Sequence, residues 1–428
     1  MSEKATNRAD KDFVFPREDL CDFVAAYFDK GPLFLDAVKQ NPSPLYVLEP
    51  EVLRQKANRF RACFEKNLPR TSFYYAMKSN NLPAISGILL EQGFGLDVSS
   101  GVELQIALDL GARDIIFSGP GKTDAELLLA IDNQEKVILL VDSFGELERL
   151  KKLLEGKQKT LRIGVRLNNN PSGLWRKFGI LPEELTAFFG AVSHIPNLLF
   201  TGLQFHSSWN LTPARQIDFI IELGGLLRTL PAALLAKIAF IDIGGGFWPS
   251  QGEWLLEDPT EKEVAGHDPK NAGGERDALL HYRIPALPIE VFAREIGAGI
   301  KEHILSLIDC KICFELGRWI CHESMHILIQ VIDKKASDLV ITDAGTNAVG
   351  WERFEVDYFP VLNLSAPDLT EKPCHILGAL CTPHDVWGYA YFGKSISPGD
   401  VLLIPTQGAY TYSLRQNFIK ALPQVVLI

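Results

Sequence analysis

From about residue 70 the chain repeats one pattern of apolar and polar positions. Each repeat has a short apolar run rich in β-branched and aromatic residues, then a polar loop, then a segment with the apolar periodicity of a helix. Strands that alternate with helices in this way predict a parallel sheet. We expect eight strands, at residues 73–77, 95–98, 115–118, 137–141, 162–167, 200–205, 239–243 and 311–315.

Three of the predicted helices begin with a capping box, in which a Ser or Thr accepts from the N3 amide and a Glu at N3 reaches back. The pairs are Ser100 with Glu103, Thr123 with Glu126, and Ser143 with Glu146. Eight strand and helix units fit a (β/α)8 TIM barrel, which builds its active site at the carboxyl ends of the strands. An open doubly wound sheet is the competing interpretation, but it would be unusually long for one domain.

We place the barrel at residues 50–308 and a discontinuous β domain at residues 13–49 and 309–428. After residue 320, apolar runs separated by turn signals such as SPGD suggest antiparallel strands. The segment SPLYVLEP near residue 45 also looks like a strand, which could pair with that sheet. A polar, Gly-rich insertion at residues 257–277 suggests a surface excursion, before an amphipathic helix near residues 288–308.

Composition narrows the class of protein. The 428 residues carry a net charge of -10 and no long Lys/Arg run, so the basic surface of a nucleic-acid-binding protein is missing. No apolar stretch approaches the roughly 20 residues that a membrane-spanning helix requires, and the amino terminus is polar rather than signal-like. We therefore expect a cytoplasmic protein that acts on small molecules, with two domains and a frayed first dozen residues.

The seven cysteines are scattered and odd in number, which argues against a disulfide framework. Cys310 and Cys313 form a C-x-x-C, but in a strand-like run these two positions point to opposite faces. No second Cys/His pair has zinc spacing, so we predict no metal site.

Lys78 follows the first predicted strand, in FYYAMKSN. A charged lysine at the end of a buried strand loses hydration, and a Schiff base with pyridoxal 5'-phosphate (PLP) removes that cost. A lone lysine would more often be a solvent-exposed side chain. Here chemically matched residues follow at the ends of later strands, so we interpret Lys78 as the lysine that binds PLP.

Three glycines, Gly244, Gly245 and Gly246, follow the seventh strand. Such glycines let backbone amides approach a phosphate, and a barrel usually binds phosphate here and in the loop after strand eight, where Arg318 lies. A tight turn is the simpler interpretation of three glycines alone. A second Gly-rich string, SGPGKT, is not a P-loop, because Ile116 occupies the position of the first glycine.

Glu315, at the end of the eighth strand, indicates the reaction class. A carboxylate beside the pyridine nitrogen keeps that nitrogen protonated, so the ring accepts the electron pair released when a bond at the substrate Cα breaks. A racemase of this architecture typically has an arginine there. Considered alone, Glu315 could pair with Arg318, and His206 after strand six could be a core histidine rather than a ring stacked on the cofactor.

At these residues the sequence resembles the fold type III PLP-dependent decarboxylases, the ornithine/diaminopimelate/arginine decarboxylase family, and is diaminopimelate-decarboxylase-like. The motifs YAMKSN, GLDVSSGVEL, KFG, GGG, ELGR, DAGTN, GALCTPHD and GAY follow in the family's order from about residue 43 onward. The resemblance implies a barrel of the alanine racemase type, a C-terminal β domain partly built from the amino-terminal segment, and a head-to-tail homodimer with shared active sites.

The resemblance also implies a role for each matching residue. Lys78 would hold PLP, His206 would stack on its ring, and Glu315 would bind the pyridine nitrogen. Cys381 of the partner subunit would protonate the carbanion that remains when CO2 leaves through a quinonoid. The groups implied around the phosphate and the cofactor are Ser208, Gly244, Gly245, Gly246, Gly317, Arg318 and Tyr410.

Two departures from the family pattern bear on function. The family usually has H-x-G-S where this chain has His206-Ser207-Ser208-Trp209, so the phosphate-binding serine is displaced or replaced by Ser208. Members that form diamines carry an acidic residue after the cysteine, whereas this chain has Thr382. Because an unpaired buried ammonium would cost about 3–5 kcal/mol, we predict a conjugated or carrier-linked amino acid as substrate rather than a simple diamino acid.

Three other functions compete with this one: a meso-diaminopimelate decarboxylase of lysine biosynthesis, an amino-acid racemase, and a non-catalytic PLP-binding regulator. Glu315 argues against the racemase, and a regulator would need neither Lys78 nor Cys381. Candidate substrate contacts, with packing or surface roles as the alternative, are Thr382, Asp385, Trp209 and His384.

Overall fold

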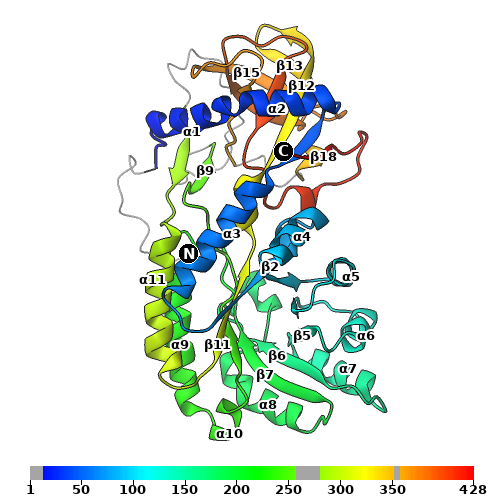
Figure 1. Ribbon diagram of the computed structural model, residues 1–428, viewed down its shortest axis with the longest axis vertical. Coiled ribbons are helices and arrows are strands. Elements are labelled where there is room, and N and C mark those ends of the chain that lie inside the picture. Colours follow the sequence, from blue (N-terminus) through cyan, green and yellow to red (C-terminus); the bar gives the residue numbers. More distant parts are fainter. Residues whose placement is uncertain (1–12, 257–279, 351–356) are drawn as a thin grey trace. The chain divides into compact units, whose positions relative to one another are not determined.

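The computed structural model describes residues 13–256, 280–350 and 357–428 of the chain. The chain divides into two compact units, which we call the barrel unit and the β unit (Figure 1). The barrel unit comprises residues 50–250 and 286–321, and the β unit comprises the described parts of residues 1–49, 251–285 and 322–428.

The division between the units differs from the predicted boundary at residue 308. Residues 311–316 form a strand of the barrel, which therefore extends beyond that boundary. Conversely, β9 (Glu253–Leu255) and β10 (Tyr282–Ile284) pair as a small antiparallel sheet that belongs to the β unit. The predicted excursion at residues 257–277 and the predicted frayed first dozen residues lie outside the described residues.

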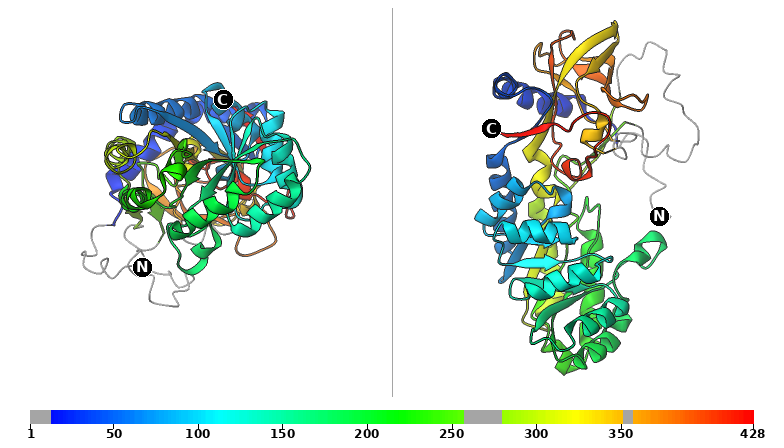
Figure 2. Two further views of the ribbon diagram at one scale, coloured as in Figure 1. Left: turned by 90° about the horizontal axis from the view of Figure 1, so that it is seen from below. Right: turned by 90° about the vertical axis from the view of Figure 1, so that its right-hand side faces the viewer.

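Eight strands form a closed parallel barrel in the order β11-β2-β3-β4-β5-β6-β7-β8, which confirms the predicted (β/α)8 fold. Helices lie around these strands in the left view of Figure 2. Each of the eight predicted runs forms a strand whose ends lie within two residues of the prediction. The strands are β2 (Thr71–Ala76), β3 (Gly95–Val98), β4 (Ile115–Phe117), β5 (Val137–Val141), β6 (Leu161–Arg166), β7 (Leu198–Gln204), β8 (Phe240–Asp242) and β11 (Lys311–Leu316).

Packing of the barrel interior separates an apolar end from a polar end. Barrel strands are buried on both faces, so they are almost continuously apolar, as in the fully buried β5. A layer formed by Tyr74, Ile116 and neighbouring apolar side chains fills the amino-terminal half, and Gly202 leaves room there for the ring of Phe240. The buried polar side chains Asp97, Gln204, Asp242 and Glu315 lie beyond this layer, toward the carboxyl ends of the strands, where a barrel carries its site.

The helices of the barrel unit follow the strands as predicted, and the expected amphipathic helix near residues 288–308 is α11 extended by a π-helical turn at Lys301–Leu305. The helices are α3 (Pro50–Glu65), α4 (Pro83–Glu91), α5 (Gly101–Asp109), α6 (Asp124–Asp132), α7 (Phe144–Leu154), α8 (Leu185–Ser193), α9 (Ala214–Thr229), α10 (Ala232–Leu235), α11 (Ile289–Ile300) and α12 (Arg318–Cys321).

One of the three predicted capping boxes is complete. At α6 the Thr123 hydroxyl accepts from the amide of Glu126, whose carboxylate accepts from the Thr123 amide at 2.7 Å. At α5 and α7 the cap serines accept from the N3 amides, as predicted. There, however, the N3 glutamates accept from the amide of the residue before the cap, Ser99 or Asp142. All three helix starts are nonetheless satisfied by side chains.

The β unit contains an eight-stranded sheet in the order β13-β15-β16-β14-β17-β12-β1-β18. The sheet is mixed rather than antiparallel as predicted, because three of its strand pairs are parallel. Strand β1, the predicted strand near residue 45, pairs with β12 and β18, which confirms that it joins this sheet. The elements are α1 (Arg17–Asp29), α2 (Gly31–Gln40), β1 (Leu45–Leu48), β12 (Met325–Ala336), β13 (Leu339–Thr342), β14 (Leu362–Asn363), β15 (Glu371–Leu377), β16 (Val386–Phe392), β17 (Val401–Ile404) and β18 (Gln424–Leu427).

Candidate cofactor site

Lys78 lies in a 3-10 turn (Met77–Ser79) that directly follows β2. Its Nζ donates to Asp97 Oδ2 at 2.9 Å, and the lysine side chain is 36% exposed whereas that of Asp97 is fully buried. Burial and the negative charge of Glu315 raise the pKa of Asp97 to about 7, against the positive charge of Lys78. The amine of Lys78 is therefore held at the end of the barrel strands by a buried acid, while part of the side chain remains accessible.

Glu315 lies in β11, the strand next to β2, and its side chain is buried. Gln204 Nε2 donates to both carboxylate oxygens, at 3.2 and 3.4 Å. Burial opposes ionisation, but the positive charges of Lys78 and Arg166 outweigh it and lower the pKa of Glu315. Glu315 is consequently an ionised carboxylate in the barrel interior.

The ring of His206 is fixed by the glycine loop that follows β8. The Gly245 amide donates to His206 Nδ1 at 3.1 Å, and Nε2 lies 3.3 Å from Ser208 Oγ. Nδ1 is also 3.7 Å from Glu315 Oε2, which is beyond hydrogen-bond distance. Burial lowers the pKa of His206, although Glu315 opposes this shift. Because Nδ1 accepts from Gly245, the neutral ring carries its proton on Nε2.

The glycines at 244–246 are required by close backbone packing. Gly244 and Gly246 have φ of +69° and +78°, and a Cβ at Gly245 would overlap the carbonyl oxygen of Glu315. The Gly244 amide donates to Asp242 Oδ1 at 2.8 Å. Two of the three amides thus bind protein acceptors, so this loop offers fewer amide donors to a phosphate than three consecutive glycines suggest.

Gly317 and Arg318 follow Glu315 beside the turn that carries Lys78. A Cβ at Gly317 would lie 3.0 Å from the Cβ of Ser79, so glycine permits this close approach. The Arg318 guanidinium lies over the Trp248 ring, 4.3 Å from its centroid. The exposed Trp209 stacks on the same indole, with ring centroids 6.2 Å apart, and has a left-handed φ of 55°. A cation and two indoles therefore lie together at the end of the barrel.

The Cys381 loop, residues 378–385, connects β15 and β16 in the β unit. Cys381 is exposed. Asp385 is buried, and its two oxygens accept from the Thr346 amide at 2.7 Å and the Leu380 amide at 2.6 Å. These contacts order the loop that carries Cys381, and the contact of Asp385 with the substrate stays a prediction.

Tyr410 also belongs to the β unit and has a left-handed φ of 57°. Two residues before it, the Gly408 amide donates to the carbonyl of His322 at 3.0 Å, and the hydroxyl of Thr411, directly after it, donates to the carbonyl of Gln407. A tyrosine keeps such a backbone only where its surroundings impose it. The barrel unit carries Lys78, His206, Ser208, Trp209, Gly244, Gly245, Gly246, Glu315, Gly317 and Arg318, and the β unit carries Cys381, Thr382, His384, Asp385 and Tyr410.

Three buried polar residues of the site were missed in the sequence: Asp97, Gln204 and Asp242. Each lies at or near the carboxyl end of an otherwise apolar strand, β3, β7 or β8. A polar side chain at this position of a barrel strand is itself a signal of function, because the carboxyl ends of the strands converge on the site.

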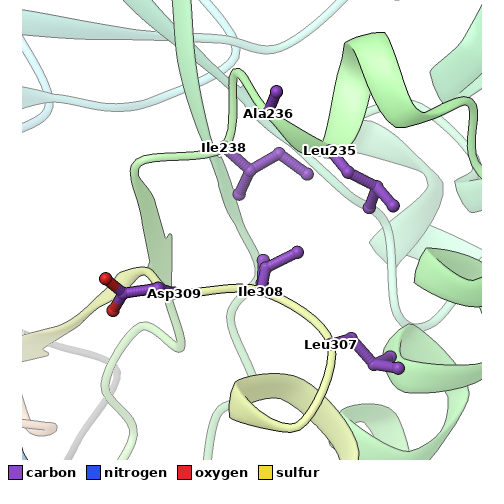
Figure 3. Close-up of a pocket in the computed structure, with 6 residues that line it drawn as sticks. All are labelled: Leu235, Ala236, Ile238, Leu307, Ile308 and Asp309. Atoms are coloured by element: carbon purple, nitrogen blue, oxygen red, sulfur yellow. The ribbon is translucent and has the colours of Figure 1, made fainter.

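Two cavities lie at the other end of the barrel. One, of about 260 Å³, is lined by Leu235, Ile238, Leu307 and Asp309, among others (Figure 3). The second, of about 210 Å³, includes Tyr74 and the amino ends of several strands. Neither contains a residue of the predicted site, so neither changes the location of that site at the carboxyl ends.

The residues of the barrel unit suit PLP. Lys78 offers a partly exposed amine, Glu315 offers a buried ionised carboxylate, and His206 presents a neutral ring whose orientation is fixed. The glycine loop and the Arg318 cation lie at the ends of β8 and β11, the usual phosphate position of a barrel. An amine, an anion and a phosphate-binding loop at one end of a barrel match the three recognition features of this cofactor.

The chain belongs to the fold type III pyridoxal-dependent decarboxylases. Its residues 53–265 match the family described as "Pyridoxal-dependent decarboxylase, pyridoxal binding domain". Diaminopimelate decarboxylase of Synechocystis sp. is 31% identical over 447 residues, which cover 96% of this chain and 89% of that protein. The protein is therefore a PLP-dependent amino-acid decarboxylase.

Two further relatives show the range of the similarity. L-glutamyl-[BtrI acyl-carrier protein] decarboxylase of Niallia circulans is 25% identical over 402 residues, or 88% of this chain and 86% of that protein. The crystal structure of diaminopimelate decarboxylase from Helicobacter pylori complexed with L-lysine has the same fold, with a TM-score of 0.73 at 21% identity over 92% of this chain and 94% of that one. Within the described part of the chain, no helix has both the length and the apolar character needed to cross a membrane.

Proposed function

We propose that this enzyme decarboxylates an α-amino acid whose distal end is conjugated or carrier-linked, rather than a free diamino acid. The Cys381 loop carries this proposal. Thr382 follows Cys381, and the carboxylate of Asp385, the acid within residues 378–385, is buried and accepts hydrogen bonds from its own unit through both oxygens. The loop therefore presents no acidic group that could pair with a distal ammonium.

In this proposal the barrel residues bind and orient PLP. Lys78 binds the cofactor, Glu315 faces the protonated pyridine nitrogen, and His206 lies against the ring. When bound, PLP supplies an electron sink for the pair released at the substrate Cα. The low pKa of Glu315 supports its assignment, because an ionised carboxylate stabilises a protonated nitrogen. The residues assigned to the phosphate and its surroundings are Ser208, Gly244, Gly245, Gly246, Gly317, Arg318 and Tyr410.

The proton that replaces CO2 at the Cα is assigned to Cys381 of the partner subunit in a homodimer with shared sites. The exposed position of Cys381 on an ordered loop is consistent with a residue that acts outside its own unit. Mixed dimers test this assignment. Lys78→Ala and Cys381→Ala homodimers should both be inactive, whereas randomly mixed dimers should recover roughly a quarter of the wild-type activity, because half of them contain one complete site. No recovery would refute the shared site.

The relatives support two substrates. The name of the Niallia circulans relative states a glutamyl group on an acyl-carrier protein, in agreement with the proposed substrate class. The Synechocystis relative is named a diaminopimelate decarboxylase and has the higher identity of the two, 31% against 25%. Decarboxylation of free meso-diaminopimelate is therefore the second candidate function.

CO2 release by the PLP-loaded enzyme distinguishes the two candidates. The panel is free meso-diaminopimelate, lysine, ornithine, arginine, and glutamate linked to a carrier protein, with Lys78→Ala as the inactive control. We expect turnover of the carrier-linked substrate and none of the free diamino acids. Thr382→Glu should gain activity on a free diamino acid, and the neutral, matched Thr382→Gln should not. Steady CO2 release from free meso-diaminopimelate by the wild type would refute the proposal and support the second candidate.

A further inference from the structure

Asp242 is a buried acid at the end of β8 that has no assigned role. Its side chain is completely inaccessible to solvent. One oxygen, Oδ1, accepts from the Gly244 amide at 2.8 Å. The other, Oδ2, has no hydrogen-bond partner among the described residues. Burying a carboxylate oxygen without a hydrogen-bond donor costs free energy of folding, so the protonation state of Asp242 must be explained.

The neighbouring Gln204 also has a buried oxygen that lacks a hydrogen-bond partner among the described residues. Its Nε2 donates to Glu315, but its carbonyl oxygen Oε1 is buried and also lacks a partner among the described residues. Gln204 and Asp242 are direct Cα partners in the parallel β7–β8 pair. Residues in register on neighbouring strands point to the same face, and the contact with Glu315 places the Gln204 side chain in the barrel interior. Asp242 Oδ2 and Gln204 Oε1 are both acceptors if Asp242 is ionised.

The charges around Asp242 favour its neutral form. On the elements packed against β8, β11 contributes Glu315 and the thiol of Cys313, and β3 contributes Asp97 across the interior. Burial, followed by the negative charges of Glu315 and Asp97 and a direct side-chain interaction with the Glu315 carboxylate, raises the pKa of Asp242 well above its usual range, against the Gly244 amide. The pKa of Glu315 shifts in the opposite direction and is lowered, in part by the positive charge of Lys78. When two neighbouring acids have pKa values shifted in opposite directions, one is typically kept protonated and the other ionised, and each has its own role.

We propose that Asp242 is a neutral positioning residue whose Oδ2–H donates to Gln204 Oε1. This proposal rests on the assignment of Glu315 to the pyridine nitrogen. With the proton on Asp242, one hydrogen bond gives a partner to both Asp242 Oδ2 and Gln204 Oε1. It also fixes the Gln204 amide so that its NH2 group, rather than its carbonyl, faces Glu315. Glu315 is thereby kept ionised and oriented, and Asp242 acts through Gln204 without touching the substrate.

Infrared difference spectra of the cofactor-free protein test the proton directly. Wild type minus Asp242→Asn should show the carbonyl stretch of a protonated carboxylic acid at neutral pH, with a shift in D2O. The matched control is Asp109→Asn, which changes an exposed acid at the end of α5 and should show only the bands of an ionised carboxylate. Absence of the protonated band at Asp242 would overturn the proposal. Because this measurement needs neither PLP nor substrate, it remains decisive if the proposed function fails.

Kinetics of the PLP-loaded variants test the positioning role. Asparagine can accept from Gly244 and donate to Gln204, so Asp242→Asn should retain most of kcat. Asp242→Leu removes both hydrogen bonds and should lower kcat by about tenfold or more, with little change in KM, because Gln204 then no longer orients the charged Glu315. If Asp242→Asn is impaired as much as Asp242→Leu, an ionised Asp242 is required and the proposal is wrong. If Asp242→Leu does not fold, the infrared spectra and the kinetics of Asp242→Asn still test whether Asp242 is neutral.

Discussion

A buried ion pair at the carboxyl end of the barrel gives the most quantitative prediction. Lys122 Nζ lies 2.8 Å from Glu146 Oε1, and each side chain is only 1% exposed. The lysine also donates to the carbonyl of Gly119 at 2.6 Å, and Glu146 Oε2 accepts from the Asp142 amide at 3.3 Å. Because Lys122 follows β4 and Glu146 begins α7 after β5, the pair ties two loops of the active-site end together.

Lys122→Met leaves the carboxylate of Glu146 buried without its cation, which should lower the free energy of unfolding by about 3–5 kcal/mol at pH 8. Burial already raises the pKa of Glu146, and Lys122 opposes that shift, so its removal raises the pKa further. A carboxyl group with a raised folded-state pKa contributes stability that is present below its unfolded pKa and is lost as the pH rises through the folded value. The penalty should therefore shrink when the pH falls toward about 4.

Urea unfolding followed by far-ultraviolet circular dichroism measures this effect. Lys122→Met combined with Glu146→Gln should recover at least about 2 kcal/mol relative to the sum of the two single changes, because neither charge is then left alone. Lys151→Met, the same replacement on the exposed face of α7, should change the free energy by no more than about 0.5 kcal/mol. A loss below about 1 kcal/mol for Lys122→Met at pH 8, or strict additivity in the double variant, would refute the reasoning.

Two further predictions concern the cofactor site. A pKa of Asp97 raised from 3.8 to about 7 corresponds to about 4 kcal/mol that the cofactor-free protein loses as the pH rises from about 4 to about 7. Asp97→Asn should therefore flatten the dependence of the urea midpoint on pH across this range, and an unchanged slope would contradict this. Gly245→Ala should abolish PLP binding, measured by visible absorbance, because its Cβ would overlap the backbone of Glu315. The control is Gly225→Ala in α9, where the added Cβ meets no other atom, and it should leave PLP binding intact. Normal PLP binding by Gly245→Ala would contradict the prediction, because it would show that the loop moves to accommodate the Cβ.

The eight strands and their order could be predicted because each signal is local. Apolar runs of the right length, such as the one in β5, and capping residues such as Thr123 act within a few residues of the chain. Lys78, Gly244 and Glu315 could be recognised for the same reason, since each occupies the end of a strand that is identifiable by itself. Repetition of one strand and helix unit then limited the architecture to a barrel or an open sheet.

Tertiary structure alone decided how the polar side chains meet. Gln204 and Glu315 are 111 residues apart in sequence, and their hydrogen bond depends on the register of strands that only closure of the barrel sets. The hydrogen bond from the Thr346 amide to Asp385 likewise joins residues 39 positions apart in sequence. Burial and neighbouring charges, which a single segment does not contain, determine which of Asp97, Asp242 and Glu315 is ionised. Local pattern thus determines the strands, whereas long-range packing determines the chemistry at their ends.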